Sequence, residues 1–277
     1  MAATVTASAA FAGDMLDEAL AIIARAARAG VRLRLVGGLA VLATSRDRDF
    51  AVRPFRDIDL VGLRRQSRQI VHALTAMGFE ENRHVRFATA GQTVQFFREC
   101  RHVDGAGRRA HVDDRVDVYL DAFRLDHEIA LKHRLELGSD TVPAADVLLV
   151  KLQHTWPGPD DLRDAVAVLK DLEQSPTEAP GVIDVDYLAG LCARDWPLHH
   201  DVTANLARCR ALLPMMGLSE RERAAAEAAI ARLTAALAAR RKTLRWHLRA
   251  LAGERLPWSD TVDERDAQRV GLRESVS

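Results

Sequence analysis

The stretch Val31-Arg32-Leu33-Arg34-Leu35-Val36-Gly37-Gly38 gives the clearest indication of the fold. Apolar and basic residues alternate up to Val36, which predicts a strand with one buried face. Residues 39–43 then indicate a helix, so Gly37 and Gly38 would form the turn at its N-terminus. Glycine lets backbone N–H groups approach a bound group closely, and a helix N-terminus favours anions. We therefore expect either a phosphate-binding turn or a tight strand-to-helix turn without a ligand.

Two acidic residues lie in the next apolar stretch, Asp57-Ile58-Asp59-Leu60-Val61. In a strand, Ile58 and Leu60 would occupy the buried face, which places Asp57 and Asp59 together on the other face. Two neighbouring carboxylates repel each other unless a cation lies between them, and a hard divalent ion with oxygen ligands would relieve that repulsion. The alternative is a solvent-facing strand whose aspartates only discourage aggregation.

A third acidic residue for the same site comes from the stretch Arg115-Val116-Asp117-Val118-Tyr119-Leu120-Asp121. Its apolar residues define a buried strand face and leave Asp117, Tyr119 and Asp121 on the opposite face. We expect Asp117 to complete the site, because Asp121 lies at the end of the strand, where an aspartate more often forms a turn or a helix cap.

The glycine pair, the Asp-x-Asp strand and the third aspartate together resemble the nucleotidyltransferase superfamily, whose core is a mixed sheet flanked by helices. Residues 146–152 and 159–164 are similar to the lysine helix and the paired-aspartate helix of the abortive-infection type of nucleotidyltransferase toxins and their uncharacterised bacterial relatives. The resemblance covers roughly residues 30 to 173.

The resemblance implies a role for each of the five residues at the centre of the predicted site. Gly37 and Gly38 match the turn that contacts phosphate, and Asp57 and Asp59 match the metal-binding pair. Asp117 matches the third carboxylate, which helps to hold metal and accepts the proton of the acceptor hydroxyl. We expect Mg²⁺ or Mn²⁺ as the cofactor.

Three further residues are implied as substrate-binding: Lys151, Asp161 and Asp164. Lys151 matches a lysine that meets the triphosphate or the substrate, while the two aspartates match a motif whose role differs among relatives. The residues by themselves leave other roles open. Lys151 could extend from an apolar helix to water, and Asp161 and Asp164 could be first-turn acids that interact with a helix dipole.

The segment between Gly38 and Asp57 is longer than we expect for the toxin group. It carries four arginines: Arg46, Arg48, Arg53 and Arg56. These side chains would either contact the triphosphate or indicate that this subgroup uses a different substrate.

We predict an α+β fold in which a nucleotidyltransferase-like mixed sheet flanked by helices spans residues 1–173. An α-helical C-terminal domain would follow over residues 182–264, after a linker-like stretch, and residues 265–277 would form a flexible tail. The basic stretch 240–255, which contains Trp246, suits either a phosphodiester backbone with a stacked base or a solvent-facing helix.

Within the predicted sheet domain we also expect three smaller features. These are a helix from Arg65 to Met77, strands at residues 85–87 and 93–97, and a hairpin loop from His102 to His111 that leads into the strand of Asp117.

Composition favours a cytoplasmic protein with no membrane partner. The 39 basic and 39 acidic residues balance, so no net charge draws the chain to nucleic acid or to an anionic membrane, and any RNA partner would need a local basic patch. The N-terminal stretch lacks a basic region, and acidic residues interrupt its apolar run. The cysteines, Cys100, Cys192 and Cys209, show no metal-ligand spacing and are expected to be reduced thiols.

We therefore predict an enzyme that transfers a nucleoside monophosphate from a nucleoside triphosphate to a hydroxyl of RNA, protein or a small molecule. Two alternatives stay open. The chain could be a catalytically degenerate regulatory module that binds nucleotide without turnover, or a toxin-like component with an antitoxin partner.

Overall fold

The computed structural model describes residues 2–103 and 109–259, and within them the side chains of residues 12–98 and 115–259. The predicted tail at residues 265–277 lies outside the described residues, as does the tip of the predicted hairpin loop at residues 104–108.

Among the described residues, five strands form a mixed central sheet in the order β1-β2-β5-β4-β3. The strands are β1 (Leu33–Leu35), β2 (Ile58–Gly62), β3 (Glu80–Asn82), β4 (Thr93–Val103) and β5 (Arg109–Leu120). Strands β2 and β5 run parallel, whereas the other neighbours pair antiparallel. Two short hairpin strands, β6 (Ala122–Arg124) and β7 (Glu128–Ala130), follow β5.

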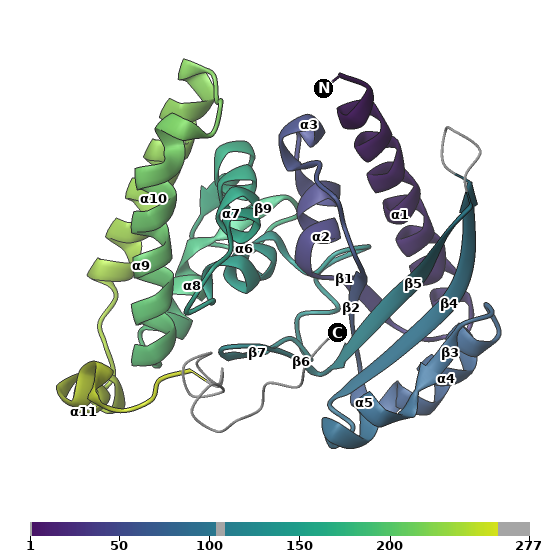
Figure 1. The fold of residues 1–277 in the computed structure, drawn as a ribbon. Coiled ribbons are helices and arrows are strands. Elements are labelled where there is room, and N and C mark those ends of the chain that lie inside the picture. The colour runs from purple at the N-terminus through teal and green to yellow at the C-terminus, as the bar shows by residue number, and fades with distance from the viewer. Residues whose placement is uncertain (1, 104–108, 260–277) are drawn as a thin grey trace.

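Helices of the N-terminal half pack against the apolar face of this sheet (Figure 1). They are α1 (Ala2–Arg28), α2 (Gly37–Thr44) and α4 (Ser67–Thr75), while the single turn α3 (Arg48–Ala51) packs against α2 and against α7 (Pro159–Asp171). On the buried side of β2, Gly62 lies against Ile70 of α4 and leaves no room for a Cβ atom there. Alternate residues of β2, β4 and β5 form the buried face: Ile58, Leu60, Val94, Phe96, Val116 and Val118. The opposite face is free to carry polar groups.

The C-terminal part of the chain is helical (Figure 1). Its helices are α6 (Ala144–Leu152), α7 (Pro159–Asp171), α8 (Val185–Cys192), α9 (Trp196–Leu212), α10 (Glu220–Ala239) and α11 (Leu244–Ala252). Helix α7 packs against α6, α9 and α10, and α2 packs against both α6 and α7. The predicted α+β class, a mixed sheet flanked by helices and followed by a helical region, is confirmed. None of the helices in the described part of the chain is both long and apolar enough to cross a membrane.

Three local predictions were wrong or inaccurate. Residues 85–87 belong to a short helix, α5 (Arg83–Ala88), because the side chain of Asn82 caps its N-terminus by accepting from the amide of His84 at 3.2 Å. The loop predicted from His102 to His111 is shorter, since β4 and β5 continue to Val103 and from Arg109. The stretch 174–181 is also partly ordered, because β8 (Glu173–Ser175) pairs in parallel with β9 (Val182–Asp184).

Candidate active site

Three carboxylates converge at the polar face of the sheet. Asp59 on β2 and Asp117 on β5 are direct partners in the parallel register, and Asp57 immediately precedes β2. Oxygen atoms of Asp57, Asp59 and Asp117 all lie within 4.8 Å of one another. Their burial is uneven, since Asp117 is 7% exposed and the other two are half-buried. The structure thus brings together the acidic residues of two strands that are about 60 residues apart in the chain.

The carboxylate of Asp117 is held in place by a polar row that continues across the sheet. Gln95 on β4 is the register partner of Asp117, and Asn82 on β3 is the register partner of Gln95. The amide of Gln95 donates to Oδ1 of Asp117 at 2.7 Å, and the amide of Asn82 donates to Oε1 of Gln95 at 2.9 Å. Sequence reasoning missed Gln95 and Asn82, because the signal lies only in the pairing of the strands.

Two other side chains of β5 lie among the carboxylates. Arg115 forms an ion pair with Asp57, and its Nε lies 3.2 Å from Oδ2 of Asp117. The hydroxyl of Tyr119 donates to Asp59. Burial and the negative charge of Asp59 raise the pKa of Tyr119 well above its ordinary value, so this phenol stays neutral and acts as a donor.

Burial and a neighbouring carboxylate together shift the pKa of Asp59. Burial, followed by the charge of Asp117, raises the pKa of Asp59 to about 6. The positive charges of Lys151 and Arg53 and the hydrogen bond from Tyr119 act in the opposite direction but do not cancel the rise. A cation between these oxygens would favour the charged form of Asp59, which burial and the charge of Asp117 disfavour.

The diglycine turn lies directly beside this cluster. Helix α2 begins at Gly37, and its N-terminus has no side-chain cap. Gly37 has a φ of +72°, a conformation that favours glycine. A Cβ atom added to Gly38 would clash with Arg53, because it would lie 2.4 Å from Nη2 of that side chain. The turn thus runs between the acidic strand and an arginine, with backbone N–H groups at an uncapped helix N-terminus.

Of the four arginines noted between the glycines and the acidic strand, Arg53 reaches the site. Its Nη2 lies 3.1 Å from Oδ2 of Asp164, and its guanidinium lies over the ring of Phe55, 4.7 Å from the centroid. Asp164 is 1% exposed, so it is a buried anion that needs such a partner.

Lys151 and the two aspartates of α7 form one buried ion cluster with Arg53. The Lys151 ammonium lies 3.1 Å from Oδ1 of Asp161 and 3.0 Å from Oδ2 of Asp164. Burial opposes the charged form of Lys151, but the carboxylates of Asp164 and Asp161 outweigh it, so the pKa of Lys151 is raised. Lys151 is 6% exposed and therefore does not extend to water, which was one of its predicted roles.

Asp161 has a second partner that matches its predicted role as a first-turn helix acid. Its Oδ2 accepts from the amide of Gly158, at the N-terminus of α7, at 3.1 Å. Burial opposes ionisation, but the charge of Lys151 outweighs it and lowers the pKa of Asp161. Asp161 therefore both stabilises the start of α7 and neutralises Lys151.

A layer of buried polar groups supports this cluster from the side of α9. The ring of His154 lies 3.8 Å from Asp161 and 3.5 Å from Asp126. Oδ2 of Asp126 accepts from the amide of Thr155 at 2.7 Å, and Oδ2 of Asp201 on α9 accepts from the hydroxyl of Thr155 at 2.9 Å. The connection between α6, which carries Lys151, and α7, which carries Asp161 and Asp164, is thereby fixed to the β6–β7 hairpin and to α9.

The donor set of the acidic cluster fits a divalent ion. Mg²⁺ and similar hard cations bind oxygen ligands at about 2.0–2.6 Å, so oxygens that lie within 4.8 Å of one another can share one ion after small rotations of the side chains. Asp57, Asp59 and Asp117 would hold it. Arg115, which now neutralises two of these carboxylates, would have to turn aside.

Comparisons with known proteins show a distant structural similarity. No family model and no curated protein matches the chain. Among solved structures, the chain is similar to an antigenic nucleotidyltransferase-like protein from Paracoccidioides brasiliensis, with a TM-score of 0.39 and 14% identity over 83% of this chain and 94% of that chain. Because this similarity is distant, we infer function from the residues of the site.

Proposed function

We propose that this protein is a metal-dependent nucleotidyltransferase that moves a nucleoside monophosphate from a nucleoside triphosphate to a hydroxyl group. One observation carries the proposal: oxygens of Asp57, Asp59 and Asp117 meet within 4.8 Å of one another, beside the glycine turn that opens α2. A phosphate-binding turn next to a cluster of carboxylates is the arrangement that transfer of a phosphoryl-type group requires.

The basic groups and the turn would orient the triphosphate. Backbone N–H groups of Gly37 and Gly38 lie at an uncapped helix N-terminus and can donate to phosphate oxygens. The Arg53 guanidinium lies against Gly38, so it can neutralise charge at the same position. Two of the three ammonium protons of Lys151 meet Asp161 and Asp164, which leaves one for a phosphate oxygen.

In this proposal, Asp117 would act on the acceptor. The acceptor oxygen would attack the α-phosphorus and form a new P–O bond, while the bond to pyrophosphate breaks and the hydroxyl proton passes to Asp117. General-base help of this kind contributes about 10²–10⁴-fold. A divalent ion bound by Asp57, Asp59 and Asp117 would neutralise charge that develops on the phosphate oxygens.

Label transfer tests the proposal. Purified protein is incubated with each α-labelled nucleoside triphosphate, Mg²⁺ or Mn²⁺, and total cellular RNA or protein extract. We expect label to appear on one acceptor with the wild type and to be lost with Asp57→Ala and with Asp59→Ala. Asp186→Ala is the matched control, because Asp186 is an exposed aspartate on α8 whose ion pair with Arg240 is a long 3.8 Å contact.

The same experiment separates the alternatives. Retained turnover in both site variants would refute the assignment of the carboxylates. Nucleotide binding without label transfer to any acceptor would favour a regulatory module. Growth arrest on expression, abolished by Asp59→Ala and relieved by a neighbouring antitoxin, would identify the enzyme as a toxin.

A further inference from the structure

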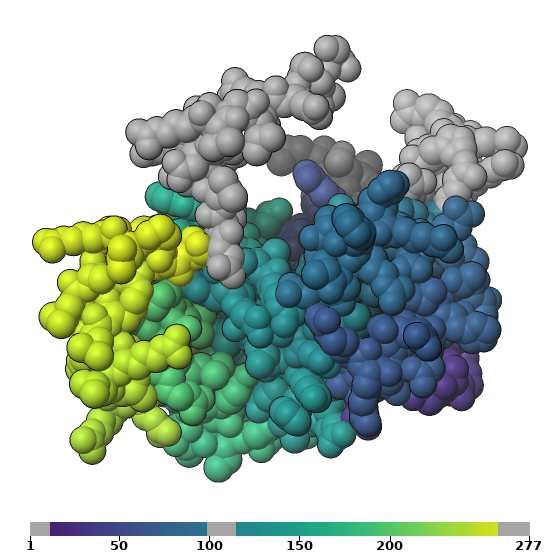
Figure 2. All heavy atoms as spheres, turned by 90° about the horizontal axis from the view of Figure 1, so that it is seen from below, coloured from purple at the N-terminus to yellow at the C-terminus, as the bar shows by residue number. Residues whose placement is uncertain are grey.

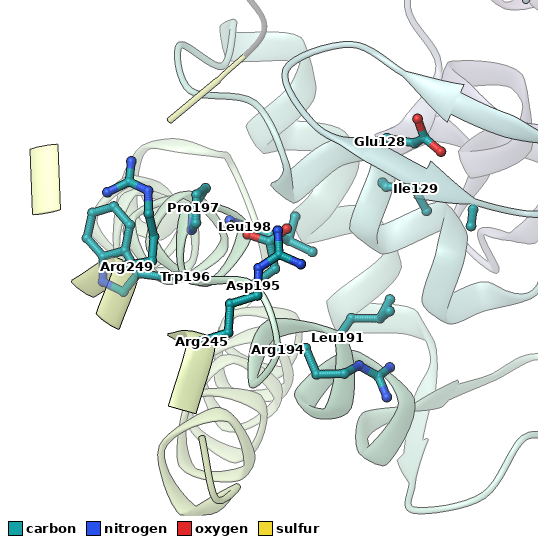
Figure 3. A pocket seen from close by; sticks show the side chains of 11 residues that line it. Glu128, Ile129, Leu191, Arg194, Asp195, Trp196, Pro197, Leu198, Arg245 and Arg249 are labelled. Carbon is teal, nitrogen blue, oxygen red and sulfur yellow. Dashed lines mark hydrogen bonds between the residues drawn. The ribbon is translucent and has the colours of Figure 1, made fainter. Parts of the chain in front are cut away.

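A cavity of about 400 Å³ lies outside the acidic site, between β7, the turn that joins α8 to α9, and α11 (Figure 3). Arg194 comes from the turn, whereas Arg245 and Arg249 come from α11. Apolar side chains complete the walls: Ile129, Ala130, Leu191, Pro197 and Leu198. The cavity is thus a cationic site with an apolar wall, and it belongs to none of the groups described above.

The positive charges of this cavity are not compensated. Within the described part of the chain, the exposed side chains of Arg194 and Arg245 have no hydrogen-bond or ion-pair partner. Arg249 donates to the carbonyl oxygens of Gly253 at 2.7 Å and Leu256 at 3.1 Å, which are neutral acceptors and leave its charge in place.

The two acidic residues that line the cavity are already occupied. Oε2 of Glu128 lies 3.0 Å from Nε of Arg124, which neutralises it. Oδ1 of Asp195 accepts from the amide of Leu198 at 3.2 Å and caps the N-terminus of α9. The amide of Leu198 is neutral and leaves the charge of Asp195 in place, so three arginines face one uncompensated carboxylate and the lining still presents an excess of positive charge to a ligand.

The aromatic side chains near the cavity are not free to stack a base. The guanidinium of Arg249 covers Trp196 at 4.9 Å, and His200 stacks on Trp196 with centroids 5.0 Å apart at an angle of 22°. Trp246, which the sequence suggested as a stacking platform, meets His199 edge-on at 5.3 Å. Recognition here must therefore rely on charge and backbone shape.

We propose that this cavity binds a backbone phosphate of a single-stranded RNA acceptor. Guanidinium groups match the oxygens of a phosphate with paired donors, and a volume of about 400 Å³ accommodates roughly one nucleotide unit. The apolar wall suits the sugar of a nucleotide. A free inorganic anion would leave that wall uncovered. The claim that this RNA supplies the acceptor hydroxyl rests on the proposed function. The claim that RNA binds in this cavity does not depend on it.

The cavity wall is joined to the Lys151 cluster through a neighbouring segment of the chain and two contacts of His154. Glu128 of the cavity wall lies two residues after Asp126, which contacts His154, and His154 in turn contacts Asp161 of the Lys151 cluster. On the face shown in Figure 2, the yellow C-terminal residues and the blue residues of the sheet domain lie on either side of teal residues from the middle of the chain.

The test is binding of a fluorescently labelled single-stranded RNA to the full chain, followed by anisotropy at several salt concentrations. The variant is the double substitution Arg194→Gln/Arg245→Gln. Its matched control is Arg221→Gln/Arg232→Gln, which removes the same charge from exposed positions of α10. Inorganic phosphate and phosphatidylserine vesicles serve as competitors that represent other phosphate sources.

We expect the cavity variant to bind RNA at least ~10-fold more weakly and with a salt dependence whose slope is smaller by ~0.7, because the contact with one phosphate is lost. The control should bind like the wild type. Equal affinities of the wild type and the cavity variant, an equal loss in the control, or displacement of RNA by millimolar phosphate or by vesicles would overturn the proposal. Asp59→Asn should keep RNA affinity, so that failure of label transfer and failure of RNA binding are observed separately.

Discussion

Gly37 and Asp59 are in direct contact: a Cβ atom added to Gly37 would lie 2.4 Å from Oδ2 of Asp59. The backbone links the same two segments, since the amide of Val36 donates to the carbonyl oxygen of Asp59 at 3.0 Å. The start of α2 and the acidic strand β2 therefore form one unit. Any side chain at position 37 must displace a carboxylate of the proposed metal site.

Gly37→Ala should therefore damage both stability and activity. Alanine at a φ of +72° is strained by about 1–3 kcal/mol, and its methyl group would push Asp59 away from Asp117. Gly30→Ala is the control, because Gly30 has the same φ of +72° with nothing within 4 Å of an added Cβ. Denaturant unfolding should show a larger loss of stability for Gly37→Ala than for Gly30→Ala. Only Gly37→Ala should lose label transfer. Equal stability losses and retained transfer would contradict the contact.

Asp59→Asn should abolish transfer and yet stabilise the protein at neutral pH without metal. The pKa of Asp59 is about 6 in the folded chain, against an ordinary value of 3.8, so between these values the native state binds more protons than the unfolded state. The free energy of unfolding therefore falls as pH rises from about 4 to 6, by at most about 1.4 kcal/mol for each pH unit. The variant lacks this contribution and should exceed the wild type by about 3 kcal/mol at pH 7, which is the difference between the two pKa values converted at about 1.4 kcal/mol for each pH unit.

Thermal unfolding at several pH values, with and without Mg²⁺, measures this effect. Below about pH 4 the Asp59 contributions of wild type and variant converge. Added Mg²⁺ favours the charged form and should raise the Tm of the wild type but not that of Asp59→Asn. A wild-type advantage at pH 7 in the absence of metal would show that this carboxylate is not a destabilising buried charge.

Gln95→Leu should weaken metal binding by about 10–100-fold, because the carboxamide orients Oδ1 of Asp117 at 2.7 Å. Asn82→Leu removes the next link of the row and should have a smaller effect, since Gln95 keeps its own contact with Asp117. Mn²⁺ titration followed by electron paramagnetic resonance gives the affinity independently of turnover. Unchanged Mn²⁺ affinity in Gln95→Leu would show that Gln95 and Asn82 contribute to packing and not to metal binding.

Lys151→Met should cost about 3 kcal/mol of stability and weaken triphosphate binding, because it removes a cation from the buried carboxylate of Asp164 and the half-buried carboxylate of Asp161. Lys132→Met, at an exposed position, is the control. The raised pKa of Lys151 means that its contribution is complete below the unfolded value of 10.5 and is lost only above it, so the deficit should be constant from about pH 7 to 10. Calorimetric titration with a nucleoside triphosphate tests the second part, and unchanged affinity would leave Lys151 a structural residue.

Sequence alone predicted what depends on local periodicity. Alternation placed Asp57 and Asp59 on one strand face and Asp117 on another, and the glycine pair marked the start of a helix, because these features follow from the two-residue repeat of a strand and the freedom of glycine. Residues 85–87 show the limit of this reasoning. A short apolar run fits strand and helix equally, and the cap from Asn82 decided for the helix.

Only the tertiary structure decided which side chains meet. The parallel register sets Asp59 opposite Asp117 and the antiparallel register sets Gln95 beside it, while Arg53 meets Asp164 across 111 positions of the chain. Strand order and ion pairing of this kind arise from long-range packing, which optimises burial over the whole core and leaves no trace in a local pattern. The sequence therefore identified the carboxylates, and the folded chain supplied the groups that orient and neutralise them.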